Sequence, residues 1–318
     1  MLTDCNMNQV NESDIIIINL LKETDKPLPG TFLAGKLGIS RVALWKRIQN
    51  LELKGYQIQS SRRGYLLTGE DTMLPHEFTP GAPVIFFQET DSTMDQAWKL
   101  AQAGAENGTL VTAESQNHGR GQSQRPWVSP TGGLYNTFIL RSPLPQTWAG
   151  AVVMESAWKM IELLEQSGIS GVEFQWPNDL VQGSKKVGGF LVESAGSPEA
   201  PRFFTLGMGI NIHPLLHPSR ETASLAELSS HPPQRRRLSQ EMQNHLRTWA
   251  QNPDCSPRRW ENRLLRKKTP WEAETWRGEV RCFTPAGIAP DGALMDKQNR
   301  RILGFGESRI VRKKGELS

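Results

Sequence analysis

A glycine followed closely by a helix-capping serine most constrains how the beginning of this chain can fold. Residues 31–37 have helical composition, and Gly38 suits the left-handed conformation in which a helix ends. Shortly after it Ser40, a favoured N-cap residue, precedes a second helical pattern at 41–54. The apolar face of this second pattern consists of Leu44, Ile48 and Leu51. Two helices joined by so short a turn predict a helix-turn-helix.

The flanking segments extend this prediction. An earlier helix is expected at 14–22, and its apolar face would consist of Ile15, Ile18 and Leu21. Residues 56–66 alternate polar and apolar side chains around Arg62-Arg63-Gly64, which indicates a hairpin. Three helices and a hairpin are the parts of a winged helix-turn-helix, and a small helical packing module is the alternative.

The same region is strongly basic. Its Lys and Arg residues are Lys36, Arg41, Lys46, Arg47, Lys54, Arg62 and Arg63. Residues 36–66 contain one acid, Glu52, whereas the whole chain has a formal net charge of only +4. An imbalance confined to a small region favours a polyanionic partner such as DNA.

The rest of the chain mixes helical and strand patterns. Residues 67–82 are polar and rich in Pro and Gly, which indicates a linker. Strands are expected at 84–87, 110–113, 172–176, 189–193 and 203–210, and a helix at 151–166. Because the two kinds do not alternate strictly, the fold class is α+β. The tail suggests short strands at 279–283, 293–295 and 302–305, with Asp291-Gly292 as a turn, which is typical of a small β-barrel.

Composition excludes several classes of protein. With 37% hydrophobic and 22% charged residues, the chain has a globular composition and not a disordered one. Its cysteines (Cys5, Cys255 and Cys282) are too few and too far apart for a disulfide framework or a zinc site, so free thiols are expected. The longest apolar stretch, 15–21, is too short to span a membrane, and no signal segment is visible. We therefore expect a cytoplasmic protein without a membrane partner.

Four segments of the middle region carry residues suited to chemistry. Gly119-Arg120-Gly121 can surround an anion with backbone N–H groups and a guanidinium. Trp176-Pro177-Asn178-Asp179 offers an amide and a carboxylate, which suit a polar ligand or Mg²⁺. Lys186 stands just before Gly188-Gly189, where glycines permit close backbone approach. The fourth segment is Gly207-Met208-Gly209-Ile210-Asn211. Each of these segments alone is weak evidence.

In this order and spacing, with Thr90-Asp91-Ser92-Thr93 upstream, the segments resemble the biotin–protein ligases. The N-terminal Ser40-Arg41, Lys46 and Arg63-Gly64-Tyr65 resemble the DNA-binding part of the bifunctional form, the biotin operon repressor type. The resemblance covers nearly the whole chain. It implies a winged helix-turn-helix at 1–66, a linker at 67–82, a ligase domain with a mixed sheet at 83–268 and an SH3-like barrel at 269–318.

The resemblance implies a reaction in two steps. Biotin and MgATP would form biotinyl-5'-adenylate and pyrophosphate, and a lysine of a biotin carboxyl-carrier domain would then take the biotin and release AMP. Biotinyl-5'-adenylate would also be the corepressor that favours a homodimer on operator DNA. Like charges must meet in the first step, so the site needs cations and backbone donors.

Site residues follow from the positions that match. The residues implied in catalysis are Lys186, Arg120 and Asp179. Those implied in binding biotin are Ser92, Thr93, Met94, Gln116, Gly119, Arg120, Gly121, Gln122 and Lys186. ATP or the adenylate would contact Arg120, Trp127, Asn178, Lys186 and Asn211, and Asn178 and Asp179 would position Mg²⁺. The residues implied in DNA binding are Ser40, Arg41, Trp45, Lys46, Gln49, Arg62 and Arg63.

Simpler interpretations remain for some of these residues, and other functions remain for the chain. Ser92 suits a helix cap, and Trp127 suits a core position. The sequence departs from the family pattern at Met94, Gln122 and Gln175, where the family usually has asparagine, arginine and lysine. Two positive charges near the phosphates are thereby lost. A lipoate–protein ligase and a non-catalytic biotin-sensing repressor are the alternative functions.

Overall fold

The computed structural model describes residues 11–197, 201–215, 222–264, 270–275, 280–306 and 308–313. The chain divides into two compact units, of which the first comprises residues 1–78 with 234–236. The second comprises residues 79–233 and 237–318.

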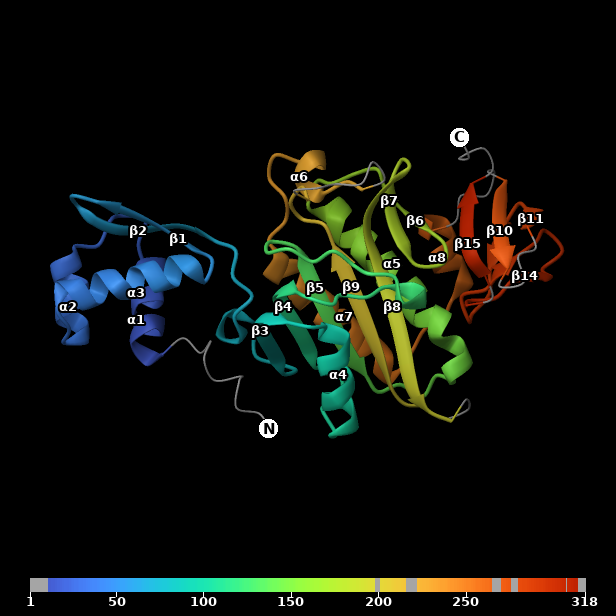
Figure 1. Ribbon diagram of the computed structural model, residues 1–318, viewed down its shortest axis with the longest axis horizontal. Helices are drawn as coiled ribbons and strands as arrows, with labels where there is room; N and C mark the ends of the chain where they lie inside the picture. Colours follow the sequence, from blue (N-terminus) through green and yellow to red (C-terminus); the bar gives the residue numbers. More distant parts are fainter. Residues whose placement is uncertain are drawn as a thin grey trace. The chain divides into compact units, whose positions relative to one another are not determined.

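The described part of the N-terminal unit has three α-helices followed by a hairpin, drawn in blue in Figure 1. These elements are α1 (Glu12–Lys22), α2 (Gly30–Leu37), α3 (Arg41–Leu53), β1 (Tyr56–Ser61) and β2 (Gly64–Glu70). Helix α2 ends at Gly38, whose φ of 64° is left-handed. At the start of α3 the Ser40 hydroxyl accepts a hydrogen bond from the Ala43 N–H at 3.1 Å. The predicted helix-turn-helix with its hairpin is confirmed.

Two expectations for this unit were wrong in detail. Ile17, and not Ile15, lies in the buried face of α1 beside Ile18 and Leu21. Four isoleucines follow one another here, so composition could not select the face, whereas helical geometry groups residues at i, i+3, i+4 and i+7. The stretch 67–82, expected to be a linker, contains some regular structure, because β2 continues to Glu70 and a short helix, η2 (Pro75–Glu77), follows. Its buried apolar side chains are Met73, Leu74 and Phe78.

The second unit is built on a mixed sheet. Among the described residues, seven strands pair in the order β3-β4-β5-β9-β8-β7-β6, and β3 with β4 is the one parallel pair. The strands are β3 (Val84–Thr90), β4 (Leu110–Gln116), β5 (Leu134–Leu140), β6 (Val172–Gln175), β7 (Asp179–Gln182), β8 (Lys185–Gly196) and β9 (Pro201–Ile210). β5 and β7 had no counterpart in the expected elements. β5 is buried throughout, so it lacks the alternation that marks a half-exposed strand.

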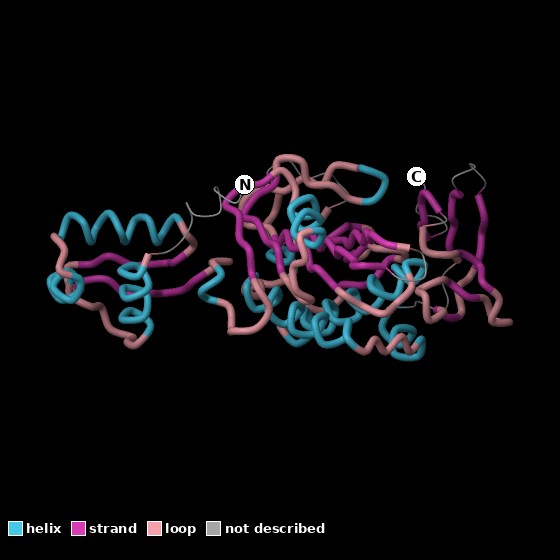
Figure 2. The backbone as a smooth tube through the Cα atoms, turned by 90° about the horizontal axis from the view of Figure 1, so that it is seen from below, coloured by secondary structure: helices cyan, strands magenta, loops and turns pink. Residues whose placement is uncertain are grey.

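Helices cover both faces of this sheet. They are α4 (Thr93–Gln102), α5 (Ala149–Gln166), α6 (Leu225–Leu228), α7 (Arg235–Gln251) and α8 (Pro257–Leu264), with short turns η3 (Gln122–Gln124) and η4 (Gln146–Trp148). On β5, the Thr137 hydroxyl donates to Thr93 of α4 at 2.9 Å, whereas the neighbouring Asn136 amide donates to Ser239 of α7 at 2.7 Å. Successive strand residues face opposite sides, so α4 and α7 lie on opposite faces (Figure 1, Figure 2).

A buried carboxylate joins the helices behind the sheet. Glu155 of α5 is fully buried, and His245 of α7 approaches it at 2.5 Å. From α8, the Trp260 indole N–H donates to the same carboxylate at 3.0 Å, and Arg259 forms an ion pair with it. Charge and hydrogen bonds from three partners make this burial tolerable.

The tail contains short strands, as expected. They are β10 (Trp271–Thr275), β11 (Val280–Phe283), β12 (Gly287–Ile288), β13 (Leu294–Met295), β14 (Arg301–Leu303) and β15 (Ser308–Lys313). In the described residues they pair as β11-β10-β15 and β12-β13-β14. The SH3-like barrel remains a prediction. Cys255 and Cys282 are free thiols, burial raises the pKa of Cys255 to about 11, and Cys5 lies outside the described residues. Within the described ranges, no helix has the length and apolar character to cross a bilayer.

Candidate functional sites

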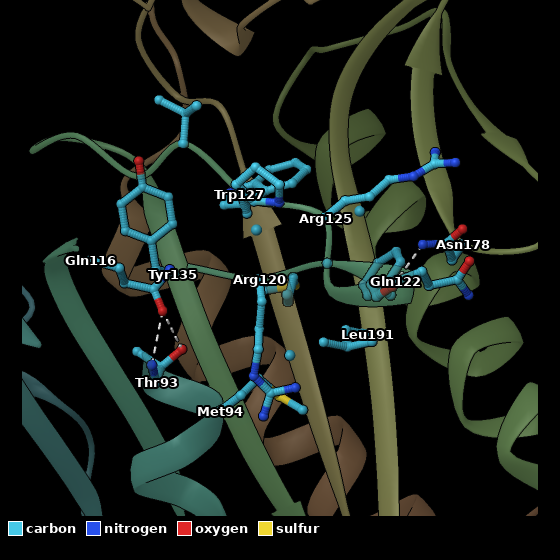
Figure 3. A pocket seen from close by; sticks show the side chains of 18 of the residues that line it. Thr93, Met94, Gln116, Arg120, Gln122, Arg125, Trp127, Tyr135, Asn178 and Leu191 are labelled. Atoms are coloured by element: carbon cyan, nitrogen blue, oxygen red, sulfur yellow. Dashed lines mark hydrogen bonds between the residues drawn. The ribbon is translucent and has the colours of Figure 1, made fainter. Parts of the chain in front are cut away.

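A cavity of about 410 Å³ opens on the α4 side of the second unit's sheet (Figure 3). Such a volume suits a small organic ligand. The residues expected at the ligase site that line it are Ser92, Thr93, Met94, Gln116, Arg120, Gly121, Gln122, Trp127, Asn178, Asp179, Lys186 and Asn211. Segments up to 119 residues apart in the sequence thus meet at one place. Gly119 is not among these lining residues; it lines a neighbouring pocket, and a Cβ there would come within 2.6 Å of the Ser129 hydroxyl.

The three expected cavity glycines at 189, 207 and 209 leave room for other side chains. A Cβ on Gly189 would lie 3.2 Å from Asp179 and 3.3 Å from Lys186. A Cβ on Gly209 would lie 2.6 Å from the Trp127 indole, and one on Gly207 would lie 2.8 Å from the Met94 sulfur. A side chain at these positions would therefore force its neighbours to shift, so glycine favours their close approach to the sheet.

Lys186 and Asp179 form the charged end of the cavity. Their Nζ and Oδ1 atoms are 2.7 Å apart, and the Lys186 ammonium lies 5.1 Å from the centre of the Trp127 ring. Trp127 is half-buried, and its indole N–H is without a hydrogen-bond partner in the described residues. A plain core role for Trp127 does not explain an indole that lines a cavity with an unused donor. Lysine, carboxylate and indole are thus gathered around the same space.

The start of α4 forms another wall. The Gln116 side-chain oxygen accepts hydrogen bonds from the Thr93 N–H at 2.8 Å and from the Thr93 hydroxyl at 3.0 Å (Figure 3). The Gln116 amide donates to Ser129 at 2.9 Å. Ser92 occupies the N-cap position, but its hydroxyl makes no capping bond. That hydroxyl is buried and, within the described residues, lacks a partner. Ser92 therefore has hydrogen-bonding capacity left for a ligand, whereas Thr93 and Gln116 chiefly hold each other.

Arg120 has a different environment from the one its sequence suggested. Its guanidinium makes an ion pair with Glu193 of β8 and a second one, at 2.8 Å, with Asp95 of α4. The Glu193 hydrogen bonds raise the pKa of Arg120 further above its ordinary value, despite partial burial. The backbone of this loop is also engaged, because the Gly121 N–H donates to the Arg125 carbonyl at 2.8 Å. Through these ion pairs, Arg120 attaches the glycine loop to the sheet and to α4.

Arg125 is a cavity residue that the sequence analysis did not select. It lines the cavity, and Figure 3 shows its side chain extending from the loop toward the side where Asn178 lies. In the described part of the chain, its guanidinium makes no ion pair. The turn that carries it, η3, has left-handed backbone at Ser123 and Gln124, with φ of 56° and 59°. Arg125 closely follows the glycine loop in the sequence, and this position was the signal that could have identified it as a cavity residue.

Of the residues expected near ATP and Mg²⁺, the two asparagines are already engaged in hydrogen bonds. The Asn178 amide donates to the Phe190 carbonyl at 3.0 Å, and Asn211 donates to the Ala223 carbonyl at 3.1 Å. Asp179 is the carboxylate beside the cavity's charged end. No cluster of three or more His, Cys, Asp or Glu side chains that could hold a metal occurs among the described residues. Asp179 with phosphate oxygens fits Mg²⁺, which usually keeps waters and substrate phosphates as ligands.

The N-terminal unit presents a separate basic face. Arg41, Trp45, Lys46 and Gln49 are exposed on α3, and Arg62 and Arg63 are exposed on the turn of the hairpin. Ser40 caps α3, so its hydroxyl is already engaged. A groove of about 560 Å³ lies between the start of α3 and the hairpin, and its lining includes Arg41, Val42, Trp45, Arg62, Arg63 and Tyr65. Val42 was not among the expected residues, since an exposed valine carries no charge signal.

Comparison with known families agrees with this division. Residues 86–211 match the model of the biotin/lipoate A/B protein ligase family, and residues 15–66 match that of an HTH domain. The chain therefore contains a region similar to the biotin/lipoate A/B protein ligase family, preceded by a region similar to a helix-turn-helix domain.

Individual relatives are more specific. The bifunctional ligase/repressor BirA of Bacillus subtilis is 31% identical over 196 residues, which is 58% of this chain and 60% of that protein. The biotin–[acetyl-CoA-carboxylase] ligase of Paracoccus denitrificans is 35% identical over 128 residues, 39% of this chain and 52% of its own. This chain thus spans less than two thirds of the length of these relatives. In fold it is similar to biotin protein ligase from Aquifex aeolicus in complex with biotin and ATP, with a TM-score of 0.57, 22% identity, and coverage of 73% of this chain and 99% of that one.

Proposed function

We propose that this chain is an ATP-dependent biotin–protein ligase that also binds DNA as a biotin-responsive repressor. The observation that carries the ligase proposal is the cavity in which Lys186, Asp179 and Trp127 meet the glycine loop. The similarity to the biotin–[acetyl-CoA-carboxylase] ligase of Paracoccus denitrificans over 39% of the chain supports biotin as the small molecule. The N-terminal helix-turn-helix, with exposed cations such as Arg41 and Arg62 that have no carboxylate partner among the described residues, supports the DNA-binding part.

In the first step, a biotin carboxylate oxygen attacks the α-phosphorus of ATP. The bond from this phosphorus to the bridging oxygen breaks, and pyrophosphate leaves. Both reactants are anionic, so the transition state needs a fixed cation between them. Lys186 is suited to this role because Asp179 and the Trp127 ring hold its ammonium at the charged end of the cavity. Trp127 lines the cavity beside Lys186, and we assign it to stacking on adenine.

In the second step, the amine of a carrier-domain lysine attacks the carbonyl carbon of the biotinyl-adenylate. An amide bond forms, the bond to the phosphate oxygen breaks, and AMP leaves. Lys186 can stabilise charge on the departing phosphate, and Asp179 can orient the incoming amine. Magnesium would bind Asp179 with ATP oxygens and would neutralise triphosphate charge. Ser92, with its unused hydroxyl, would bind the polar head of biotin.

Arg120 and Arg125, the arginines in and after the glycine loop, have different roles. Arg120 is held by two carboxylates, so we assign it the task of fixing the loop over biotin. Arg125 is available for a phosphate because no carboxylate pairs with it in the described residues. It therefore offsets part of the charge that Gln122 lacks. Lys185 does not offset this missing charge. Its side chain is exposed, and it lies next to Lys186 on β8, where neighbouring side chains face opposite sides.

ATP–pyrophosphate exchange tests the ligase proposal. Purified protein with MgATP and labelled pyrophosphate should exchange label when biotin is added and should not do so with lipoate. Exchange with lipoate alone would identify a lipoate–protein ligase instead. Exchange with neither, together with tight biotin binding, would identify a non-catalytic biotin sensor.

Partners and location follow from the same proposal. The acceptor would be a biotin carboxyl-carrier domain of a carboxylase, and the DNA would be an operator of biotin genes. The ligand-loaded protein would act as a homodimer in the cytoplasm, where ATP and carboxylases are found. Sedimentation with and without biotin and MgATP tests the dimer, which should appear with ligand; a monomer under both conditions would contradict it.

A further inference from the structure

The outward face of α3 carries apolar side chains where a solvated helix would be polar. Val42, Trp45 and Gln49 follow one another at i, i+3 and i+7 on this face. Val42 is 65% exposed and Trp45 is 49% exposed. The residues that attach α3 to the core lie on its other side and are Leu44, Ile48 and Leu51.

Single exposed apolar residues are ordinary, but these two form one surface. Val42 and Trp45 lie one helical turn apart near the start of α3, and both line the groove beside the hairpin turn. In a helix-turn-helix, the N-terminal residues of the second helix are those that reach base edges. Val42 and Trp45 therefore occupy the part of the second helix whose side chains contact bases in helix-turn-helix domains.

The charges around this surface indicate which kind of partner binds there. Arg41, Lys46, Arg62 and Arg63 are exposed and, in the described residues, form no ion pair. Such cations complement the phosphates on both walls of a duplex groove. The thymine C5-methyl group is the apolar group that the major groove of DNA presents. RNA lacks this methyl group, and its major groove is too deep and narrow for a helix.

We propose that Val42 and Trp45 contact the methyl groups of thymines in the major groove and so make this chain selective for A·T base pairs. Gln49 lies on the same face, and an amide at this position can bind N6 and N7 of adenine. The inference rests on the proposed DNA-binding function and adds which base pairs are read. The four cations supply affinity, and the apolar pair supplies part of the specificity.

The probe is a duplex selected from random DNA by the full-length protein with biotin and MgATP. Its dissociation constant is measured with thymidine and with deoxyuridine, which lacks the methyl group, for the parent, Val42→Ala and Trp45→Ala. Ile16→Ala is the control, because Ile16 is 44% exposed on α1, away from this face. We expect deoxyuridine to weaken parent binding about fourfold for each methyl group contacted. This penalty should shrink in both α3 variants and persist in Ile16→Ala.

Each other outcome has a distinct meaning. Enrichment of no duplex would refute the proposed DNA-binding function itself. An enriched duplex whose affinity is unchanged by deoxyuridine, or a penalty that is equal in parent and both variants, would overturn the inference alone. A preference for duplex RNA of the same sequence would overturn it as well. So would a change in the sedimentation of DNA-free protein caused by Trp45→Ala, because the face would then be a protein–protein contact.

Discussion

The two candidate ligand-binding surfaces of this chain differ in how their cations are paired. In the cavity, Arg120 is paired with Glu193 and Asp95, and Lys186 is paired with Asp179, whereas Arg125 has no carboxylate partner among the described residues. On the N-terminal face, exposed cations such as Arg41 and Arg62 have no carboxylate partner among the described residues. Paired cations have fixed positions and a reduced net field, which suits an exact fit to a small ligand. Unpaired cations provide an attractive field, which suits a long polyanion.

The largest effect is expected at Lys186. Lys186→Ala should lower biotin-dependent pyrophosphate exchange by about 10²–10³, because a preorganised cation in a water-poor site typically contributes that much. The neighbouring Lys185→Ala is the matched control and should stay within twofold of the parent, since Lys185 is exposed. Exchange by Lys186→Ala within twofold of the parent would remove Lys186 from the mechanism.

The second effect concerns the hairpin turn. For each phosphate that the protein neutralises, DNA affinity falls by about 0.9 log unit per log unit of salt. Arg62→Ala with Arg63→Ala should therefore flatten the salt dependence of DNA binding and weaken binding at 0.1 M salt by roughly 10–100-fold. Lys26→Ala, an exposed lysine elsewhere in this unit, serves as the control. An unchanged slope in the double variant would show that these arginines do not contact phosphates.

The third effect concerns retention of the adenylate. A charge-assisted hydrogen bond contributes about 1.5–3 kcal/mol against about 1 kcal/mol for a neutral one, so Gln122→Arg should slow adenylate release roughly tenfold. Release is followed by chasing labelled biotinyl-adenylate with unlabelled ligand. Gln124→Arg in the same turn is the control, because Gln124 does not line this cavity. Equal release from the parent and Gln122→Arg would mean that Gln122 is not a weakened clamp.

The smallest effect is expected at the loop anchor. Glu193→Gln removes one of the two carboxylates that hold Arg120, and the pair is partly exposed, so its contribution is modest. The KM for biotin should rise roughly two- to fivefold while kcat stays near the parent value. Glu162→Gln on α5 controls for loss of a surface carboxylate. A drop in kcat with an unchanged KM would show that Glu193 acts on the chemistry and does not merely position the loop.

Local sequence patterns predicted the structural features that depend on residues close together in the sequence. Gly38 and Ser40 mark the turn between α2 and α3 because the left-handed residue and the cap act on adjacent residues. The buried strand β5 was missed, since a strand covered on both faces has no alternation. Resemblance in motif order predicted twelve of the residues that line the cavity, but it missed Arg125 and the pairing of Arg120. Its partners lie 25 and 73 residues away in the sequence, and only folding brings them together.

One salt titration of the full-length protein compares the two surfaces directly. Biotin binding without ATP and binding of a selected DNA duplex are measured on the same preparation between 0.05 and 0.5 M salt, a range of roughly one log unit. We predict that DNA affinity falls by about 0.9 log unit per phosphate contacted, whereas biotin affinity changes by less than about twofold. A steep loss of biotin affinity, or a DNA affinity insensitive to salt, would contradict the distinction between a cavity whose Arg120 and Lys186 are paired and a face whose exposed cations have no partner among the described residues.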